Sequence, residues 1–206
     1  MARKTKGLTQ RNQFIILTNG KNSEQDYFLA LRAKGRSIYD IRIEFENAAP
    51  IDLIKRAVKE KRGSNRIWIV FDKDEFPSDS NNSVFADARK NGIGVAFSNA
   101  AFEVWLIDHF RTMDQEKTAR ELRLELDRLL KNHGYSKGYD KNDKAVHTEM
   151  FIPRIDEAMH NAEVSLQQRI LEHKRMSPNV KDLPYCEWNS STTVHKLVEA
   201  LKLESR

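Results

Sequence analysis

The sequence predicts an α/β fold with a mostly parallel four-stranded sheet and flanking helices, followed by a C-terminal helical extension. Short apolar runs alternate with helix-period segments through the first half of the chain, and parallel strands need such crossover helices. After residue 112 no strand pattern appears, and long amphipathic segments follow. We therefore predict an α/β domain over residues 1–112 and a helical extension packed on it over residues 113–206.

Four apolar segments are predicted as strands. The run IWIVF is uniformly apolar, which is typical of a strand covered on both faces. The run IRIEFE alternates between apolar and polar residues, which indicates a strand with one wetter face. The predicted strands are residues 14–18, 41–46, 67–71 and 93–98.

Helix-period segments separate these strands and fill the second half of the chain. Ser23 is the predicted N-cap of the first helix and Gly35 ends it, whereas Pro50 opens the second helix. Leu122 and Leu126 share one side of a later amphipathic segment. The predicted helices are residues 23–35, 51–63, 84–92, 101–110, 115–134, 149–175 and 192–204.

Composition excludes several classes of protein. The 206 residues contain no apolar run near the roughly 20 residues that cross a bilayer, so we expect no membrane span. No apolar core follows the basic start MARKTKGLTQRNQ, so we expect a cytoplasmic protein without a secretory signal. The single cysteine, Cys186, cannot form an internal disulfide, and no Cys/His cluster has zinc spacing. The net charge of +5 permits nucleic-acid binding without requiring it.

Polar side chains follow three of the predicted strands, and ligands of parallel α/β sheets bind at such carboxyl ends. These polar segments are Thr18-Asn19-Gly20, Asp72-Lys73-Asp74, and Ser98-Asn99 followed by Glu103. Asp72 and Asp74 point the same way because strand side chains repeat every two residues. Two hard oxygen ligands suit Mg²⁺ or Mn²⁺, which stabilises the charge that develops in phosphodiester cleavage. A polar exit from a strand is the open alternative, since Asp is also common at turns.

Other candidates also have two interpretations. Glu103 is either an acid facing Asp72 and Asp74 or a first-turn glutamate favoured by the helix dipole. His109 follows Trp105 by four residues, which favours a packed histidine over a catalytic one. The segment around His195 is preceded by Ser190–Thr193, and it is either a helix-capping region or a substrate contact.

The order of strand, polar residue, glycine, helix and a later strand ending in Asp-x-Asp resembles the TOPRIM domain. More narrowly, the chain resembles the RloB family of TOPRIM-like proteins from bacterial defence loci. The matching segments are FIILTNGKNSEQDYF, IWIVFDKDEF, SNAAFEVWLIDHF and NSSTTVHKLVEAL, and together they extend over nearly the whole chain. The resemblance implies a metal-dependent nuclease-type effector of abortive infection that acts on DNA or RNA, tRNA included, together with a partner ATPase.

The resemblance implies that Asp72, Asp74 and Glu103 hold Mg²⁺ or Mn²⁺, and that residue 19 completes the catalytic site. The family pattern has glutamate directly before the glycine, whereas this chain has Asn19. Asparagine can ligate a cation weakly but cannot serve as a general base. Glu24 is either a nearby acid of the same site or an exposed or dipole-favoured acid near a helix N-terminus. Two functions remain open: a nuclease impaired at residue 19, and a catalytically silent binding partner of a defence ATPase.

Overall fold

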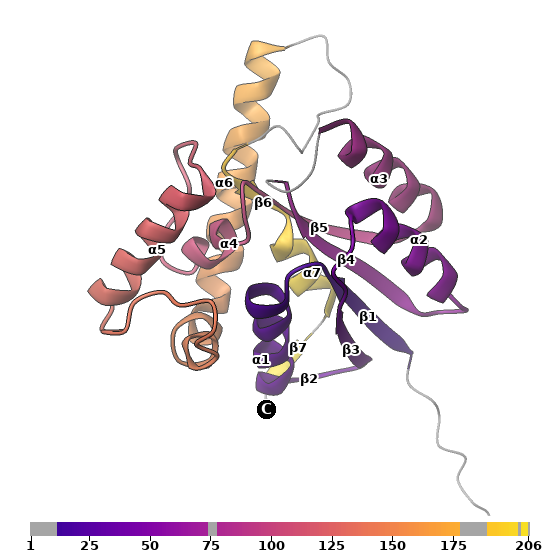
Figure 1. Ribbon diagram of the computed structural model, residues 1–206, viewed down its shortest axis with the longest axis horizontal. Helices are drawn as coiled ribbons and strands as arrows, with labels where there is room; N and C mark the ends of the chain where they lie inside the picture. Colours follow the sequence, from indigo (N-terminus) through magenta and orange to yellow (C-terminus); the bar gives the residue numbers. More distant parts are fainter. Residues whose placement is uncertain (1–11, 74–77, 178–188, 202, 206) are drawn as a thin grey trace, which may run out of the picture.

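The computed structural model describes residues 12–73, 78–177, 189–201 and 203–205. Within them, a five-stranded sheet in the order β3-β1-β4-β5-β6 has helices on both faces (Figure 1). The first four strands in this order pair parallel with one another, and they are the four strands that the sequence predicts. Their bounds are β1 Gln13–Thr18, β3 Asp40–Phe45, β4 Arg66–Asp72 and β5 Gly94–Asn99.

The prediction of four strands, with none after residue 112, was wrong. β6, Ser191–Thr192, pairs antiparallel with β5. The neighbouring Thr193 donates its backbone N–H to the carbonyl oxygen of Phe97 at 2.8 Å, and its Oγ1 accepts from the Phe97 N–H at 2.9 Å. A separate two-stranded sheet joins β2, Gly35–Ser37, to β7, Leu203–Ser205. Segments of two or three residues are too short to show strand alternation.

The helices follow the predicted order, with differences at their ends. A π-helical turn, η1, precedes α1, so Ser23 lies inside the first turn and Gly20 takes the N-cap position predicted for Ser23. Pro50 opens α2, and Gly35 follows the end of α1, as predicted. The helical elements are η1 Lys21–Gln25, α1 Asp26–Lys34, α2 Pro50–Glu60, α3 Ser78–Asn91, α4 Glu103–Asp108, α5 Ala119–Asn132, η2 His147–Phe151, η3 Ile152–Arg154, α6 Ile155–Met176 and α7 Val194–Leu201.

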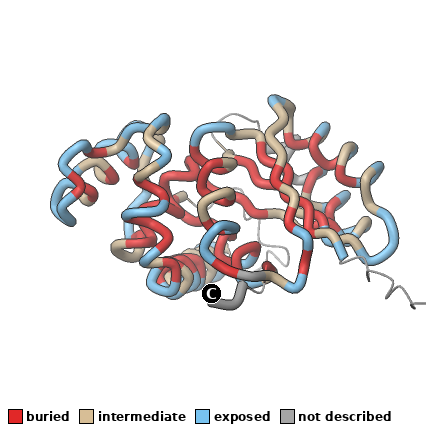
Figure 2. The backbone as a smooth tube through the Cα atoms, turned by 90° about the horizontal axis from the view of Figure 1, so that it is seen from below, coloured by how far each residue is buried: buried red, intermediate tan, exposed pale blue. Residues whose placement is uncertain are grey.

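The two faces of the sheet are covered by different parts of the chain. Alternate residues of β1 point to opposite faces, so Ile15 packs with the α2 and α3 residues while Ile16 packs with α1, α4 and the C-terminal helices. Figure 2 shows buried residues along the strands and on the inner sides of the helices. α7 packs against β5. The division of the chain at residue 112 stays a prediction.

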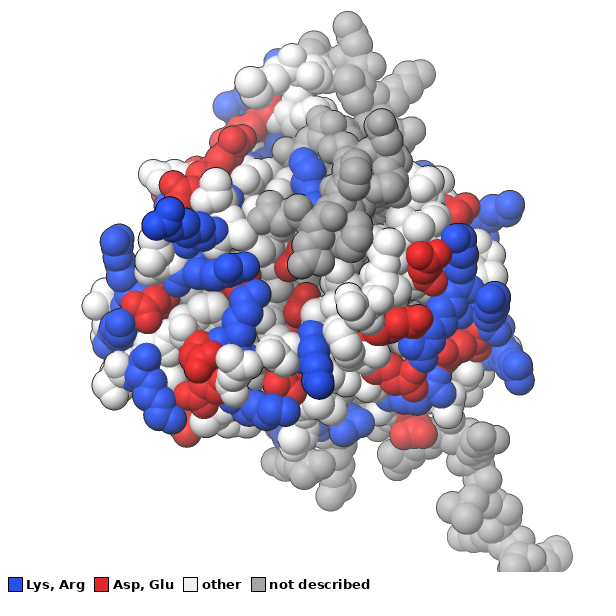
Figure 3. Space-filling model, viewed as in Figure 1, with Lys and Arg blue, Asp and Glu red and all other residues white. Residues whose placement is uncertain are grey.

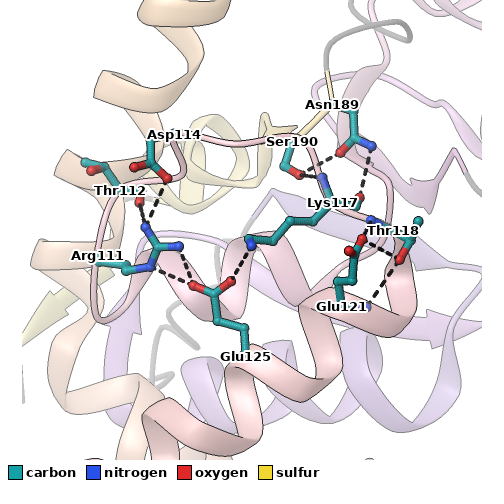
Figure 4. Close-up of polar contacts among 9 residues, drawn as sticks. All are labelled: Arg111, Thr112, Asp114, Lys117, Thr118, Glu121, Glu125, Asn189 and Ser190. Atoms are coloured by element: carbon teal, nitrogen blue, oxygen red, sulfur yellow. Dashed lines mark hydrogen bonds and ion pairs between the residues drawn. The ribbon is translucent and has the colours of Figure 1, made fainter.

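α5 is fixed to the rest of the molecule by polar contacts at its start (Figure 4). Thr118 and Glu121 form a capping box, in which each side chain bonds the backbone N–H of the other residue. The Glu125 carboxylate binds Lys117 at 3.3 Å and also pairs with Arg111. The Ser190 hydroxyl accepts from the backbone N–H of Lys117 at 3.2 Å. These contacts give α5 a defined position beside α4.

No helix in the described ranges is both long enough and apolar enough to cross a bilayer. The cytoplasmic location stays a prediction.

Candidate functional site

The carboxylates of Glu24, Asp72 and Glu103 form the acidic cluster of the molecule, at the carboxyl edge of the parallel strands. Asp72 ends β4, Glu103 begins α4 just after β5, and Glu24 lies in η1 just after β1. β1 and β5 both pair with β4. Repulsion from Glu24 and from Glu103 helps to raise the pKa of Asp72, so the three groups act on one another electrostatically.

Asp72 is held by one backbone contact. Its Oδ2 accepts a hydrogen bond from the Phe102 N–H at 2.9 Å. Its Oδ1 is buried and has no hydrogen-bond partner among the described residues. Burial is the largest cause of its pKa lying well above the ordinary value, followed by the Glu24 charge. The ionised form of Asp72 is therefore unfavourable unless a further positive charge approaches it.

Glu103 is fully buried, with an exposed fraction of 0%, and its contacts fall on one oxygen. Oε1 lies 3.2 Å from the Tyr139 hydroxyl, 3.2 Å from the Lys141 Nζ and 3.4 Å from the Arg123 Nε. Oε2 is buried without a hydrogen-bond partner in the described part of the chain. The cations therefore approach Oε1 alone, and Oε2 has no cation beside it among the described residues.

Gly20 explains how Glu24 reaches the cluster. A Cβ atom at residue 20 would lie 1.7 Å from the Glu24 Oε2, so a side chain there would displace the carboxylate. Glu24 is buried, so it is not an exposed acid, whereas its place in the first turn of η1 still fits a dipole-favoured acid. Asn19 leaves β1 beside β4, where its backbone N–H donates to the Val70 carbonyl oxygen at 3.2 Å. Residue 19 therefore lies at the same edge of the sheet as Asp72.

Asp72 and Glu103 are the predicted site residues that the structure brings together most directly. Asp74, the predicted third metal ligand, lies outside the described residues, and so do Glu75, Cys186 and Trp188. The catalytic and metal-binding roles assigned to Asn19, Asp72, Asp74 and Glu103 stay predictions.

His109 is a packed core residue. Its Nδ1 lies 2.9 Å from the Trp105 carbonyl oxygen, which can only accept, so Nδ1 carries the proton. Nε2 then accepts from the Tyr27 hydroxyl at 3.1 Å. Burial lowers the pKa of His109 to about 3, so the ring is neutral at physiological pH. The geometry favours the packed interpretation over a catalytic one.

His195 is also buried, and its Nε2 lies 2.9 Å from the Glu163 Oε2. The Thr192 Oγ1 accepts from the Val194 N–H at 3.2 Å, a contact expected of a helix-capping region. The substrate contact considered for this segment stays untested.

The donor set of the acidic cluster fits a hard divalent cation in its chemistry, because carboxylate oxygens are the ligands that Mg²⁺ and Mn²⁺ prefer. The buried, unpartnered Asp72 Oδ1 and Glu103 Oε2 are suited to such an ion. Among the described residues, however, no group of three or more His, Cys, Asp or Glu side chains could hold a metal ion. The described residues alone therefore do not supply such a group of ligands.

Sequence reasoning missed the cationic side of the site. Tyr139 and Lys141 lie in the loop between α5 and η2, and Arg123 lies on the exposed side of α5. The strand-end rule finds residues that leave the sheet, whereas these three come from the helical part of the chain. The aromatic and lysine residues of the segment GYSKGYDKND were the available signal, and it is a weak one because such loops are usually solvated.

The fold and this edge of the sheet define an α/β protein with an acidic site at the carboxyl ends of parallel strands. The family model described as RloB-like protein matches residues 14–201, so the chain belongs to the RloB-like family. No curated protein and no solved structure matches the chain.

Proposed function

We propose that this RloB-like protein is a metal-dependent nuclease-type effector of bacterial anti-phage defence, with TOPRIM-like phosphodiester chemistry on DNA or RNA. The observation that carries the proposal is the acidic cluster. Asp72 Oδ1 and Glu103 Oε2 are buried without partners among the described residues, and Glu24 adds a further negative charge. Two buried carboxylate oxygens without a hydrogen-bond partner are unusual in a purely structural site.

Each residue has a defined part in this proposal. Asp72 and Glu103, together with Asp74, would hold Mg²⁺ or Mn²⁺, which when bound supplies a Lewis acid for the phosphodiester. The Phe102 N–H orients Asp72 through Oδ2. Arg123 and Lys141 supply counter-charge to Glu103 at Oε1.

The missing carboxylate at residue 19 limits what this edge can do. Asn19 cannot accept a proton as a general base. Glu24 is the other acid that the structure brings to the cluster, and its buried carboxylate lies over Gly20. Proton transfer during cleavage would therefore depend on Glu24 or on solvent.

A silent binding partner of a defence ATPase is the second candidate. Asn19 favours it, because this chain lacks the acid of the family pattern. The ion pairs of Glu103 favour it as well, since Arg123 and Lys141 already supply counter-charge. In that case the fold is retained for binding and the chemistry is lost.

Incubation of the purified protein with single-stranded DNA, duplex DNA, mRNA-like RNA and tRNA separates the two functions. We expect cleavage of at least one substrate with Mg²⁺ or Mn²⁺, and none in EDTA or with Asp72→Asn. Protection of cells against phage should be lost in the same variant. If every substrate stays intact with both metals and with the partner ATPase present, the nuclease proposal fails and the binding partner replaces it.

A further inference from the structure

We propose that Arg120, Arg123 and Lys141 form the surface that binds the nucleic-acid backbone, and that phosphate groups there replace Glu103 as the partner of Arg123 and Lys141. This inference rests on the proposed function for the class of ligand, which is nucleic acid. The experiment below measures binding without cleavage, so the binding surface and the nuclease function can be refuted separately.

The surface is an open groove of about 460 Å³ between α5 and the loop that follows it. Arg120 and Arg123 line it from α5, and Tyr139 and Lys141 line it from the loop. Tyr139 and Lys141 also contact Glu103, so the groove adjoins the acidic cluster. Figure 3 shows Lys and Arg side chains gathered over α5, on the same face as acidic side chains nearer the centre of the molecule.

The positive charge of the groove exceeds what its own acids neutralise. Arg120 makes no ion pair with any residue that the structure describes. Asp127 lines the groove, but its carboxylate pairs with Lys131 at 2.8 Å and accepts from the Tyr139 N–H at 3.0 Å. Asp140 accepts from the backbone N–H of Asn142. An anion with several charges would therefore find cations that the groove acids do not occupy.

Arg123 and Lys141 are placed for an exchange of partners. Their side chains are 52% and 40% exposed, whereas Glu103 is fully buried, so both cations extend from solvent to a carboxylate inside the protein. A divalent cation in the acidic cluster would supply Glu103 with counter-charge from within. Even without the metal, phosphate oxygens can compete with Glu103 for both side chains, because Arg in particular binds phosphate with two N–H donors. A bound cation would favour this exchange further.

Nucleic acid fits this groove better than a protein partner does. A phosphate backbone presents evenly spaced negative charges, which suits three cations spread over a helix and a loop. It would also lie directly beside the carboxylates proposed to act on it, and Tyr139 offers an aromatic ring in the same groove.

A second cationic depression on the opposite face of the sheet provides a matched control. Lys59 and Arg62 line it together with Arg42 and Arg56, but glutamates already pair with both Arg42 and Arg56. The double variants Arg123→Ala/Lys141→Ala and Lys59→Ala/Arg62→Ala each remove one arginine and one lysine, so they change the net charge equally.

The experiment measures binding of fluorescein-labelled single-stranded DNA and RNA by anisotropy in EDTA, over a range of salt concentrations. The Arg123→Ala/Lys141→Ala variant should bind roughly tenfold more weakly, and the slope of log K against log salt should become shallower by about 1.4. The Lys59→Ala/Arg62→Ala variant should bind as the parent does. Glu103→Gln should bind more tightly than the parent, because it releases both cations while abolishing cleavage.

Arg120→Ala is the variant that does not depend on Glu103, since Arg120 lacks an ion pair to it. Its slope should become shallower by about 0.7, and a thermal melt should match that of the parent. The inference is overturned if the parent binds neither nucleic acid, if Arg120→Ala and Arg123→Ala/Lys141→Ala bind normally, or if both double variants lose the same affinity. If nucleic acid binds through the groove but the protein cleaves no substrate, the proposed nuclease function is refuted, whereas the proposed binding surface is supported.

Discussion

Two charged regions of this molecule use carboxylates in opposite ways. Between β3 and α2, the guanidinium of Arg56 pairs with Glu46 at 2.6 Å and with Glu60 at 2.8 Å, and it also contacts Glu44. Arg42 pairs with Glu44 and Glu60 in turn. We call these five residues the surface network. Its side chains are partly exposed, and every carboxylate in it has a cationic partner.

The acidic cluster lacks this balance. Arg123 and Lys141 both approach Glu103, whereas Asp72 receives, from the residues that the structure describes, only a backbone N–H at hydrogen-bond distance. The pKa values differ in the same sense. The surrounding glutamates raise the pKa of Arg56, which favours its charged form, whereas burial raises the pKa of Asp72, which disfavours its charged form. The surface network is stabilised as it stands, while the cluster would be stabilised by a cation from outside. Balance in charge thus separates a structural group of carboxylates from a candidate site.

The largest expected effect is the loss of cleavage in Asp72→Asn. Removing this carboxylate should lower the cleavage rate at least about 100-fold, because a proposed metal ligand is lost. In EDTA the melting temperature should stay the same or rise, since repulsion with Glu24 and Glu103 is relieved. Asp52→Asn, which removes an exposed acid from α2, is the matched control and should leave cleavage unchanged. A melting temperature far below that of the parent would make Asp72 a structural residue and break the comparison.

Arg56→Ala should produce the reverse pattern. The variant loses ion pairs of the surface network, so the free energy of unfolding should fall by about 1–2 kcal/mol, an amount kept small by solvent. Urea unfolding at low and high salt checks this, and the difference from the parent should shrink as salt screens the network. Cleavage should remain at the parental rate. A loss of cleavage without a loss of stability would assign a function to the surface network.

A third group of ionisable residues, the buried histidines, sharpens the contrast through pH. Burial lowers the pKa of His147 to about 4 and that of His109 to about 3, whereas an unfolded histidine titrates near 6.5. The unfolded chain therefore binds protons first as the pH falls. The contribution of each neutral histidine to the free energy of unfolding is fully present above about pH 6.5. It is lost as the pH falls toward 4, by about 1.4 kcal/mol per pH unit.

His147→Gln tests this effect. Between about pH 4 and 6.5 the variant should show a free energy of unfolding that depends less on pH than that of the parent, by up to about 1.4 kcal/mol per unit. Urea titrations at several pH values give the slope, which is independent of any constant loss of stability from the substitution. An unchanged slope would mean that His147 does not contribute to acid unfolding.

The smallest expected effect on stability belongs to Asn19→Glu. In EDTA, a further carboxylate beside Asp72 and Glu24 should lower the free energy of unfolding by about 1 kcal/mol or less. With Mg²⁺ the sign should reverse, and the metal should bind roughly tenfold more tightly, because a charged ligand has replaced a neutral one. Thermal melts over a Mg²⁺ titration measure both changes, and Asn19→Gln controls for side-chain length. If the glutamate variant is destabilised equally with and without Mg²⁺, residue 19 is not part of a metal site.

The parallel part of the fold was predictable because its signals are local. The strand around Ile69 is an uninterrupted apolar run, and helices separate it from its neighbours in sequence. β6 was not predictable, since it depends on hydroxyl contacts such as that between Ser98 and Thr192, 3.1 Å apart and distant in sequence. No periodicity in two residues could show this pairing.

The candidate site was predictable to the same extent as the strands. Asp72 and Glu103 were found because they follow strands, and parallel strands end at one edge. Arg123, Tyr139 and Lys141 were missed because their position depends on how α5 and its loop pack against α4, which is a property of tertiary structure. The burial of Glu24 was uncertain for a related reason: it requires the open space at Gly20.

Because β6 pairs with β5, this edge of the sheet cannot be completed until the C-terminal part of the chain has been synthesised. While a ribosome is still producing α5 and α6, β5 lacks the strand that borders it, and the Phe97 N–H lacks its contact with the Thr193 hydroxyl. Closing the long connection to β6 comes late, since contacts distant in sequence form slowly. The segment from β5 to Glu103 therefore gains its final packing only after α7 has been made. We expect a nascent chain to hold its proposed nuclease site unfinished until β6 and α7 have left the ribosome.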